Sequence, residues 1–127
     1  MKRIFLTLLF MLGLFAVQAD EPIAEIAFDK TVHNFGTFSE KDGVVKCTFT
    51  FKNIGDAPLV VNQVLASCGC TTSSFTEKPV EPGKTGEILI TYNGKGFPTG
   101  KMRKLITVRT NGKTRIVKLY IEGEMTK

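Results

Sequence analysis

The chain has 127 residues, of which 17 are basic and 12 acidic, so its formal net charge is +5. Hydrophobic residues make up 43% of it and charged residues 23%, the balance of an ordinary globular protein. This composition excludes a disordered tail and a collagen-like fibre, and the length is too short for a multidomain enzyme. We therefore expect one folded domain with one core.

The first nineteen residues have the layout of an export signal. Lys2 and Arg3 precede an apolar run over residues 4–17. That run is shorter than the ~20 residues that a membrane-spanning helix needs. Small residues then lead to a cleavage position between Ala19 and Asp20, which completes the pattern of a secretory signal.

We predict a signal peptide at residues 1–19 and a mature domain at residues 20–127, located in the periplasm or outside the cell. An uncleaved anchor is the alternative. No second apolar stretch reaches spanning length, so we expect no membrane span in the mature form. The mild positive charge and the predicted export argue against nucleic acid as a partner.

Apolar and polar residues alternate with a period of two through the rest of the chain, which predicts short strands. The clearest case is residues 44–51, where Val45, Cys47, Phe49 and Phe51 share one face. We predict further strands at residues 24–28, 59–65 and 86–92, the second of them buried, and turns at residues 53–58 and 77–84.

Asn111-Gly112 predicts a hairpin, because both residues tolerate the positive φ angles of a two-residue turn. Such a turn places Thr110 opposite Lys113. The same register makes the core face from these pairs: Val108 with Arg115, Ile106 with Val117, Lys104 with Leu119, and Met102 with Ile121. A slip of one residue would turn this face to solvent.

The strand and turn pattern predicts an all-β fold, an immunoglobulin-like β-sandwich of about seven strands. The Cys-Trp-Cys pattern of antibody domains is absent, because the chain has no tryptophan. Basic residues crowd the terminal hairpin: Lys101, Arg103, Lys104, Arg109, Lys113, Arg115 and Lys118. We interpret them as a solvated, edge-protecting face. An anionic partner, such as a glycan or a membrane surface, is the alternative.

The three cysteines are the residues of the chain with the most distinctive chemistry. Cys47 lies on the inward face of its predicted strand and is interpreted as a small buried hydrophobe. Cys68-Gly69-Cys70 comes where a strand ends and the polar segment that starts at Thr71 begins. We therefore expect at least one of these two thiols to be reachable from solvent.

Three arrangements of the pair stay open. Cys68 and Cys70 form a local disulfide, whose small ring makes it labile and redox-active. Alternatively, both thiolates bind copper(I) or zinc, although two ligands are too few for a closed zinc site. In the third arrangement one of them bridges to Cys47, because sequence cannot choose among the pairings of three thiols.

No catalytic residues are predicted. The chain lacks a nucleophile elbow, a phosphate-binding glycine loop and a zinc-protease helix motif. His33 is the only histidine, and no motif surrounds it, so we expect a surface or edge residue. Thiol–disulfide activity is the one enzymatic alternative.

Four segments resemble an exported bacterial family called domain of unknown function 1573. They are HNFGT at residues 33–37, FKNIGDAPL at 51–59, SCGCT at 67–71 and PGKTGEI at 82–88. The resemblance covers residues 26–124. It implies a seven-stranded sandwich similar to major-sperm-protein and cilia-associated modules, an exported location and no established activity. It also marks Cys68 and Cys70 as signature residues.

These observations lead us to expect an exported, non-enzymatic binding or scaffolding module of the cell envelope. The expected partner is an envelope or secreted protein that adds a strand to a sheet edge. No cofactor is expected. The alternative is a thiol-redox or copper-handling protein that acts through Cys68, Gly69, Cys70 and Thr71.

Overall fold

A computed structural model describes residues 21–42 and 44–127. The predicted signal peptide and its cleavage position between Ala19 and Asp20 lie outside the described residues. No helix in the described part of the chain is long and apolar enough to cross a membrane. The strands are β1 (Ile26–Phe28), β2 (Val32–Ser39), β3 (Val44–Asn53), β4 (Val61–Ala66), β5 (Thr71–Phe75), β6 (Thr85–Asn93), β7 (Gly100–Thr110) and β8 (Ile116–Thr126).

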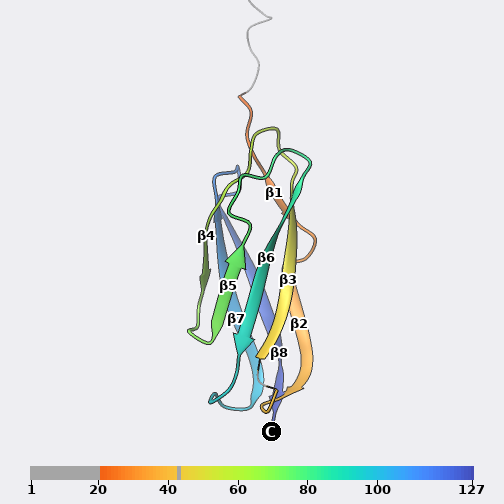
Figure 1. Ribbon diagram of the computed structural model, residues 1–127, viewed down its shortest axis with the longest axis vertical. Helices are drawn as coiled ribbons and strands as arrows, with labels where there is room; N and C mark the ends of the chain where they lie inside the picture. Colours follow the sequence, from red (N-terminus) through yellow and green to blue (C-terminus); the bar gives the residue numbers. More distant parts are fainter. Residues whose placement is uncertain (1–20, 43) are drawn as a thin grey trace, which may run out of the picture.

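The strands form two four-stranded sheets, with the orders β1-β3-β6-β5 and β2-β8-β7-β4 (Figure 1). All neighbours pair antiparallel except β2 and β8, which are parallel. The predicted all-β sandwich is confirmed. Eight strands are described, whereas about seven were predicted.

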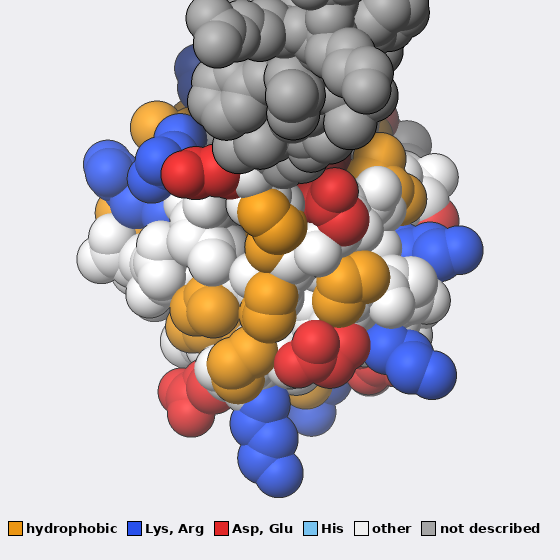
Figure 2. All heavy atoms as spheres, turned by 90° about the horizontal axis from the view of Figure 1, so that it is seen from above, with side chains coloured by type: hydrophobic (Ala, Val, Ile, Leu, Met, Phe, Trp, Pro, Cys, Tyr) orange, Lys and Arg blue, Asp and Glu red, His pale blue; other side chains and the backbone are white. Residues whose placement is uncertain are grey.

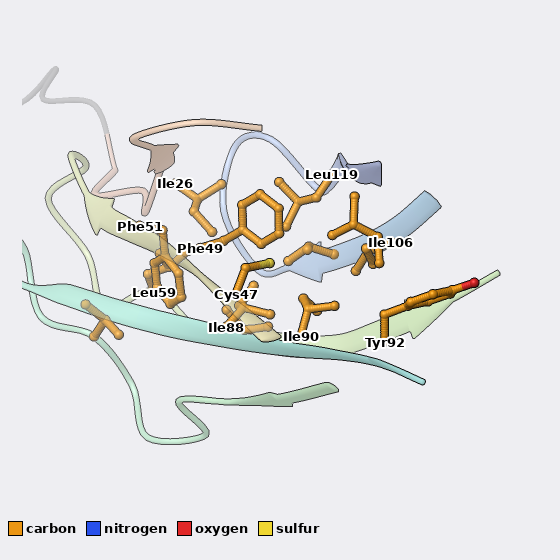
Figure 3. Packing of buried hydrophobic residues seen from close by; sticks show 14 of the residues in the cluster. Ile26, Cys47, Phe49, Phe51, Leu59, Ile88, Ile90, Tyr92, Ile106 and Leu119 are labelled. Atoms are coloured by element: carbon orange, nitrogen blue, oxygen red, sulfur yellow. The ribbon is translucent and has the colours of Figure 1, made fainter. Parts of the chain in front are cut away.

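The core lies between the two sheets and follows the predicted alternation. Phe49 of β3 pairs with Ile88 of β6, and both side chains are fully buried. Figure 3 shows them in one cluster with Ile106 and Leu119, which the second sheet contributes. Each fully buried aliphatic or aromatic side chain stabilises the fold by roughly 1.5–3 kcal/mol. Cys47 is 7% exposed within this cluster, which confirms its interpretation as a small buried hydrophobe.

The predicted hairpin register is wrong by two residues. Val108 pairs with Val117, Ile106 with Leu119, and Thr110 N–H donates to the Arg115 carbonyl (2.9 Å). The connection is therefore a four-residue loop, residues 111–114, instead of a two-residue turn. Because the error is an even number, the predicted core face is still the core face.

Tertiary hydrogen bonds account for the wider loop. The side chain of Asn111 accepts from Val60 N–H (2.8 Å) and donates to the Pro58 carbonyl (3.2 Å). Lys113 N–H donates to the Ala24 carbonyl (2.8 Å). Neither Asn111 nor Gly112 has the positive φ that a two-residue turn of this type requires. Partners from two other segments therefore outweigh the local turn preference.

Two strands were not anticipated from the pattern, and a third differs from its prediction. The segment HNFGT lies inside β2, where the pairing shifts between Asn34 and Thr37. β5 is formed by the polar segment TTSSF, which was interpreted only as the polar stretch that follows the end of a strand. β4 begins at Val61, and Leu65 is 43% exposed, so the predicted burial of residues 59–65 is wrong for that residue.

A buried amide ties three segments together at one end of the sandwich. Asn53 is fully buried, and its Nδ2 donates to the carbonyls of Ala57 (2.7 Å) and Val80 (2.9 Å). Its Oδ1 accepts from the N–H groups of Gly55 (2.9 Å) and Glu25 (3.3 Å). The predicted turn at residues 53–58 is thus held by one side chain that the segment itself supplies.

Candidate functional site at the crossover between the sheets

The two signature cysteines lie where the chain passes from one sheet to the other. β4 is an edge strand of the second sheet and β5 is an edge strand of the first. Residues 67–70 connect the two strands (Figure 1). The site therefore stands beside two strand edges.

The structure joins Cys68 to Cys70 in a disulfide, with their Cα atoms 5.2 Å apart. Cys47 is free and buried. Of the three arrangements left open by the sequence, the local disulfide is the one present, and the bridge to Cys47 is absent. Copper binding by this pair would require its reduced form, because the thiolate is the ligand. The described residues contain no group of three His, Cys, Asp or Glu side chains that could hold a metal ion.

The crossover is anchored to both sheets by hydrogen bonds. Ser67 N–H donates to the Leu105 carbonyl (3.0 Å), and Leu105 N–H donates to Ser67 Oγ (3.2 Å). At the other end, Asn93 N–H donates to the Cys70 carbonyl (2.8 Å). The first pair of bonds holds the crossover to β7, and the last bond holds it to β6.

The two sulfurs have different surroundings. Cys68 is half-buried, whereas Cys70 is only 5% exposed. Gly69 is exposed, and a Cβ placed on it would meet no atom within 4 Å apart from its two chain neighbours. Cys68 is therefore the more exposed residue of the pair, although it also packs against the core cluster, and the reachability of its sulfur stays a prediction. Thr71 is buried, and its Oγ1 lies 3.7 Å from Cys70 Sγ.

The outer edge of β5 has no hydrogen-bonded strand, since β5 is the last strand of its sheet as far as the described residues extend. The bonds flanking β5 pair Cys70 with Asn93 and Thr76 with Glu87. Because antiparallel strands bond at alternate residues, Ser73 and Phe75 direct their N–H and C=O groups outward.

The four edge strands differ in how they resist pairing with another chain. β1 has only three residues, β2 shifts register around Gly36, which has a φ of 70°, and β4 shifts register between Val61 and Gln63. Short strands and bulges are usual protections of an edge. β5 has neither a register shift nor a charged residue nor a proline. The β5 edge is therefore the least protected of the four.

Where the basic hairpin face includes Lys101 and Arg103, acidic residues of β8 lie opposite the basic side chains and offset their charge. Arg103 forms an ion pair with Glu122 (3.8 Å) and stacks over the ring of Tyr120, 4.3 Å from its centroid. Lys101 lies opposite Glu124 in the β7–β8 pairing. These contacts support the interpretation of a solvated face.

Further along the same sheet, two arginines line a surface hollow. Arg109 and Arg115 share it with the amides of Asn62 and Gln63.

His33 lies on edge strand β2, as expected for a residue without catalytic surroundings. It is half-buried, and its Nδ1 lies 2.8 Å from Lys30 Nζ. Burial and the charge of Lys30 together lower the pKa of His33.

The end of the sandwich that carries the turn of Asn53 exposes several hydrophobic side chains. Figure 2 views this end from above and shows hydrophobic side chains gathered between acidic ones. The exposed fractions are 47% for Ile23 and 61% for Ile54, and the two segments are bonded through Asp56 N–H and the Ile23 carbonyl (2.9 Å). No sequence pattern pointed to this surface.

The family described as "Protein of unknown function (DUF1573)" matches residues 26–125. The chain belongs to this family. The match covers the strands of the DUF1573 sandwich except for the last residue of β8, and it includes the disulfide, Gly69 and Thr71. No curated protein matches the sequence.

Solved structures resemble the DUF1573 domain in fold. A protein of unknown function from Porphyromonas gingivalis W83 has a TM-score of 0.64 and 16% identity, over 87% of this chain and 50% of that one. The ASH/PapD-like domain 7 of human CEP192 has a TM-score of 0.66 and 10% identity, over 87% and 92%. WR4, an MSP family member from C. elegans, has a TM-score of 0.50 and 10% identity, over 84% and 100%.

These likenesses establish the immunoglobulin-like fold of the PapD and MSP type. At such low identity they carry no residue roles. The chain spans half the length of the Porphyromonas gingivalis protein.

Proposed function

We propose that this DUF1573 domain is an exported binding module of the cell envelope, whose binding edge acts without catalysis. Its partner is an extended segment of an envelope or secreted protein, which adds to the first sheet as a strand beside β5. The observation that carries the proposal is the unprotected β5 edge, where Ser73 and Phe75 offer outward backbone groups.

Backbone bonding would supply affinity at this edge, and alternate side chains would supply specificity. On the inner face of β5, Phe75 is only partly buried, although it packs against the core cluster. An apolar side chain of an added strand would cover the rest of its ring. On the outer face, Thr72 and Ser74 are exposed and uncharged, so they oppose neither an acidic nor a basic segment.

The test is a proline substitution that removes one outward N–H. Proline is tolerated on a strand edge where the N–H faces solvent. Ser73→Pro should therefore keep the fold and abolish binding of the partner segment. Ser74→Pro is the matched control, because it removes an N–H directed at β6 and should lower stability instead.

Binding is measured by photo-crosslinking in living cells, with a benzophenone amino acid at Thr72. The same amino acid at Thr48, on the exposed face of β3, is the position control. We expect one crosslinked envelope protein from the Thr72 position, and its loss in the Ser73→Pro variant. Crosslinking that survives Ser73→Pro, or that is equal at Thr48, would rule out strand addition at β5.

A further inference from the structure

We propose that the Cys68–Cys70 disulfide is a thiol–disulfide exchange site, entered at the sulfur of Cys68, whose substrate is a dithiol. This activity goes beyond the binding of a strand at β5 and does not depend on it.

The bond is not what holds the crossover in place. Ser67 bonds to Leu105 of β7 twice, and Cys70 accepts from Asn93 of β6 through its backbone. None of these bonds uses a sulfur atom. The disulfide encloses only Gly69, and a loop this small removes little freedom from the unfolded chain. The crossover can therefore open its sulfur bridge and stay attached to both sheets.

The surroundings of the two sulfurs select the direction of attack. Exchange requires a thiolate to approach one sulfur along the line of the bond. Cys68 is half-buried, packs against the core cluster from outside it, and adjoins the exposed Gly69. Cys70 is 5% exposed within the core cluster. An incoming thiolate therefore reaches Cys68, and Cys70 is the leaving group.

The leaving sulfur has a donor beside it. Thr71 Oγ1 lies 3.7 Å from Cys70 Sγ, and its residue is 6% exposed. A hydroxyl in this position can donate to the thiolate as charge develops on it. On the entry side, Cys70 N–H donates to Cys68 Sγ (3.2 Å), which holds that sulfur in position.

The exchange balances in two steps. A thiolate of the dithiol attacks Cys68 Sγ and forms a mixed disulfide, the Cys68–Cys70 bond breaks, and its electron pair stays on Cys70, which takes up a proton. The second thiolate of the dithiol then attacks its own first sulfur and releases Cys68 as a thiolate, which is protonated in turn. Two electrons and two protons pass from the dithiol to this chain, and the dithiol leaves as a disulfide.

Dithiothreitol serves as the probe dithiol. The full chain is equilibrated in mixtures of reduced and oxidised dithiothreitol, quenched with acid, alkylated and mapped by mass spectrometry. Cys47 is an internal control, because it is buried and reacts only when the sandwich opens. We expect reversible labelling of Cys68 and Cys70 while Cys47 stays unlabelled. Labelling of Cys47 in step with the pair would overturn the proposal.

Variants that replace one cysteine of the pair test the direction of attack. The thiol of Cys68 in the Cys70→Ser variant should react with an aromatic disulfide at least about tenfold faster than that of Cys70 in the Cys68→Ser variant. Equal rates would overturn entry at Cys68. Thr71→Val keeps the side-chain shape and should slow reduction of the wild-type pair several-fold. An unchanged rate would overturn the donor role of Thr71. Protection of Cys47 in every variant verifies that it is folded.

Discussion

Replacing Asn53 by alanine should destabilise the domain strongly, because its amide is fully buried and fully bonded. The substitution removes four hydrogen bonds, to Glu25, Gly55, Ala57 and Val80. Each intramolecular hydrogen bond contributes about 1 kcal/mol net, and the bond to Glu25, at 3.3 Å, contributes least. The Val80 carbonyl keeps a second donor, Leu59 N–H, so it is not left unpaired. We expect a loss of about 3 kcal/mol in the free energy of unfolding.

Urea unfolding followed by far-ultraviolet circular dichroism measures this loss. The matched control is Asn111→Ala, which deletes the same amide group from an exposed loop where it makes two hydrogen bonds. We expect that variant to lose about 1 kcal/mol, because water replaces the exposed bonds. If the two variants differ by less than about 1 kcal/mol, burial of the Asn53 amide is not what stabilises this end of the sandwich.

Two further predictions concern the core. A Cβ on Gly86 would overlap the ring of Phe51, so Gly86→Ala should lower the free energy of unfolding in urea by about 2 kcal/mol. The control is Gly69→Ala, because a Cβ there meets no atom within 4 Å apart from its chain neighbours. Its free energy of unfolding should stay within about 0.5 kcal/mol of wild type. Burial raises the pKa of the Cys47 thiol from 9.0 to about 11, against a smaller lowering by Lys30. The unfolded chain therefore loses this proton first, and stability should fall as the pH rises from about 9 to 11. The Cys47→Ala variant, unfolded in urea over the same pH range, should lack this component, and parallel pH profiles would contradict the assignment.

The faces of the strands could be predicted from the sequence because burial imposes the alternation directly. Phe49 and Ile88 face the core because their side chains are apolar, whereas the polar residues next to them face solvent. The face of the terminal hairpin was predicted correctly even though its register was wrong, since a shift of two residues preserves the side on which Ile106 lies. Composition and the period of two were therefore sufficient to predict a β-sandwich.

Register, β5 and the sulfur pairing depend on contacts between distant segments, which periodicity does not contain. The loop of Asn111 is set by Pro58, Val60 and Ala24, far away in the chain. The segment TTSSF has no apolar alternation, and it becomes a strand because β6 offers an unpaired edge to it. The proximity of Cys68 and Cys70 is local, whereas the exclusion of Cys47 follows from the sheet order, in which β6 lies between β3 and β5.

The two proposals concern adjacent segments, and their tests separate them. Ser73→Pro alters the outer edge of β5 and leaves both sulfurs and the bonds of Ser67 intact. Loss of crosslinking with unchanged reduction by dithiothreitol would therefore support strand addition without bearing on exchange.

The double variant Cys68→Ser/Cys70→Ser removes the exchange chemistry, while the backbone bond from Asn93 to residue 70 still fixes the start of β5. Crosslinking at Thr72 in that variant would show that the edge binds its partner without the disulfide. Its absence, with Cys47 still protected, would mean that the sulfur bridge orders the edge to which the partner binds.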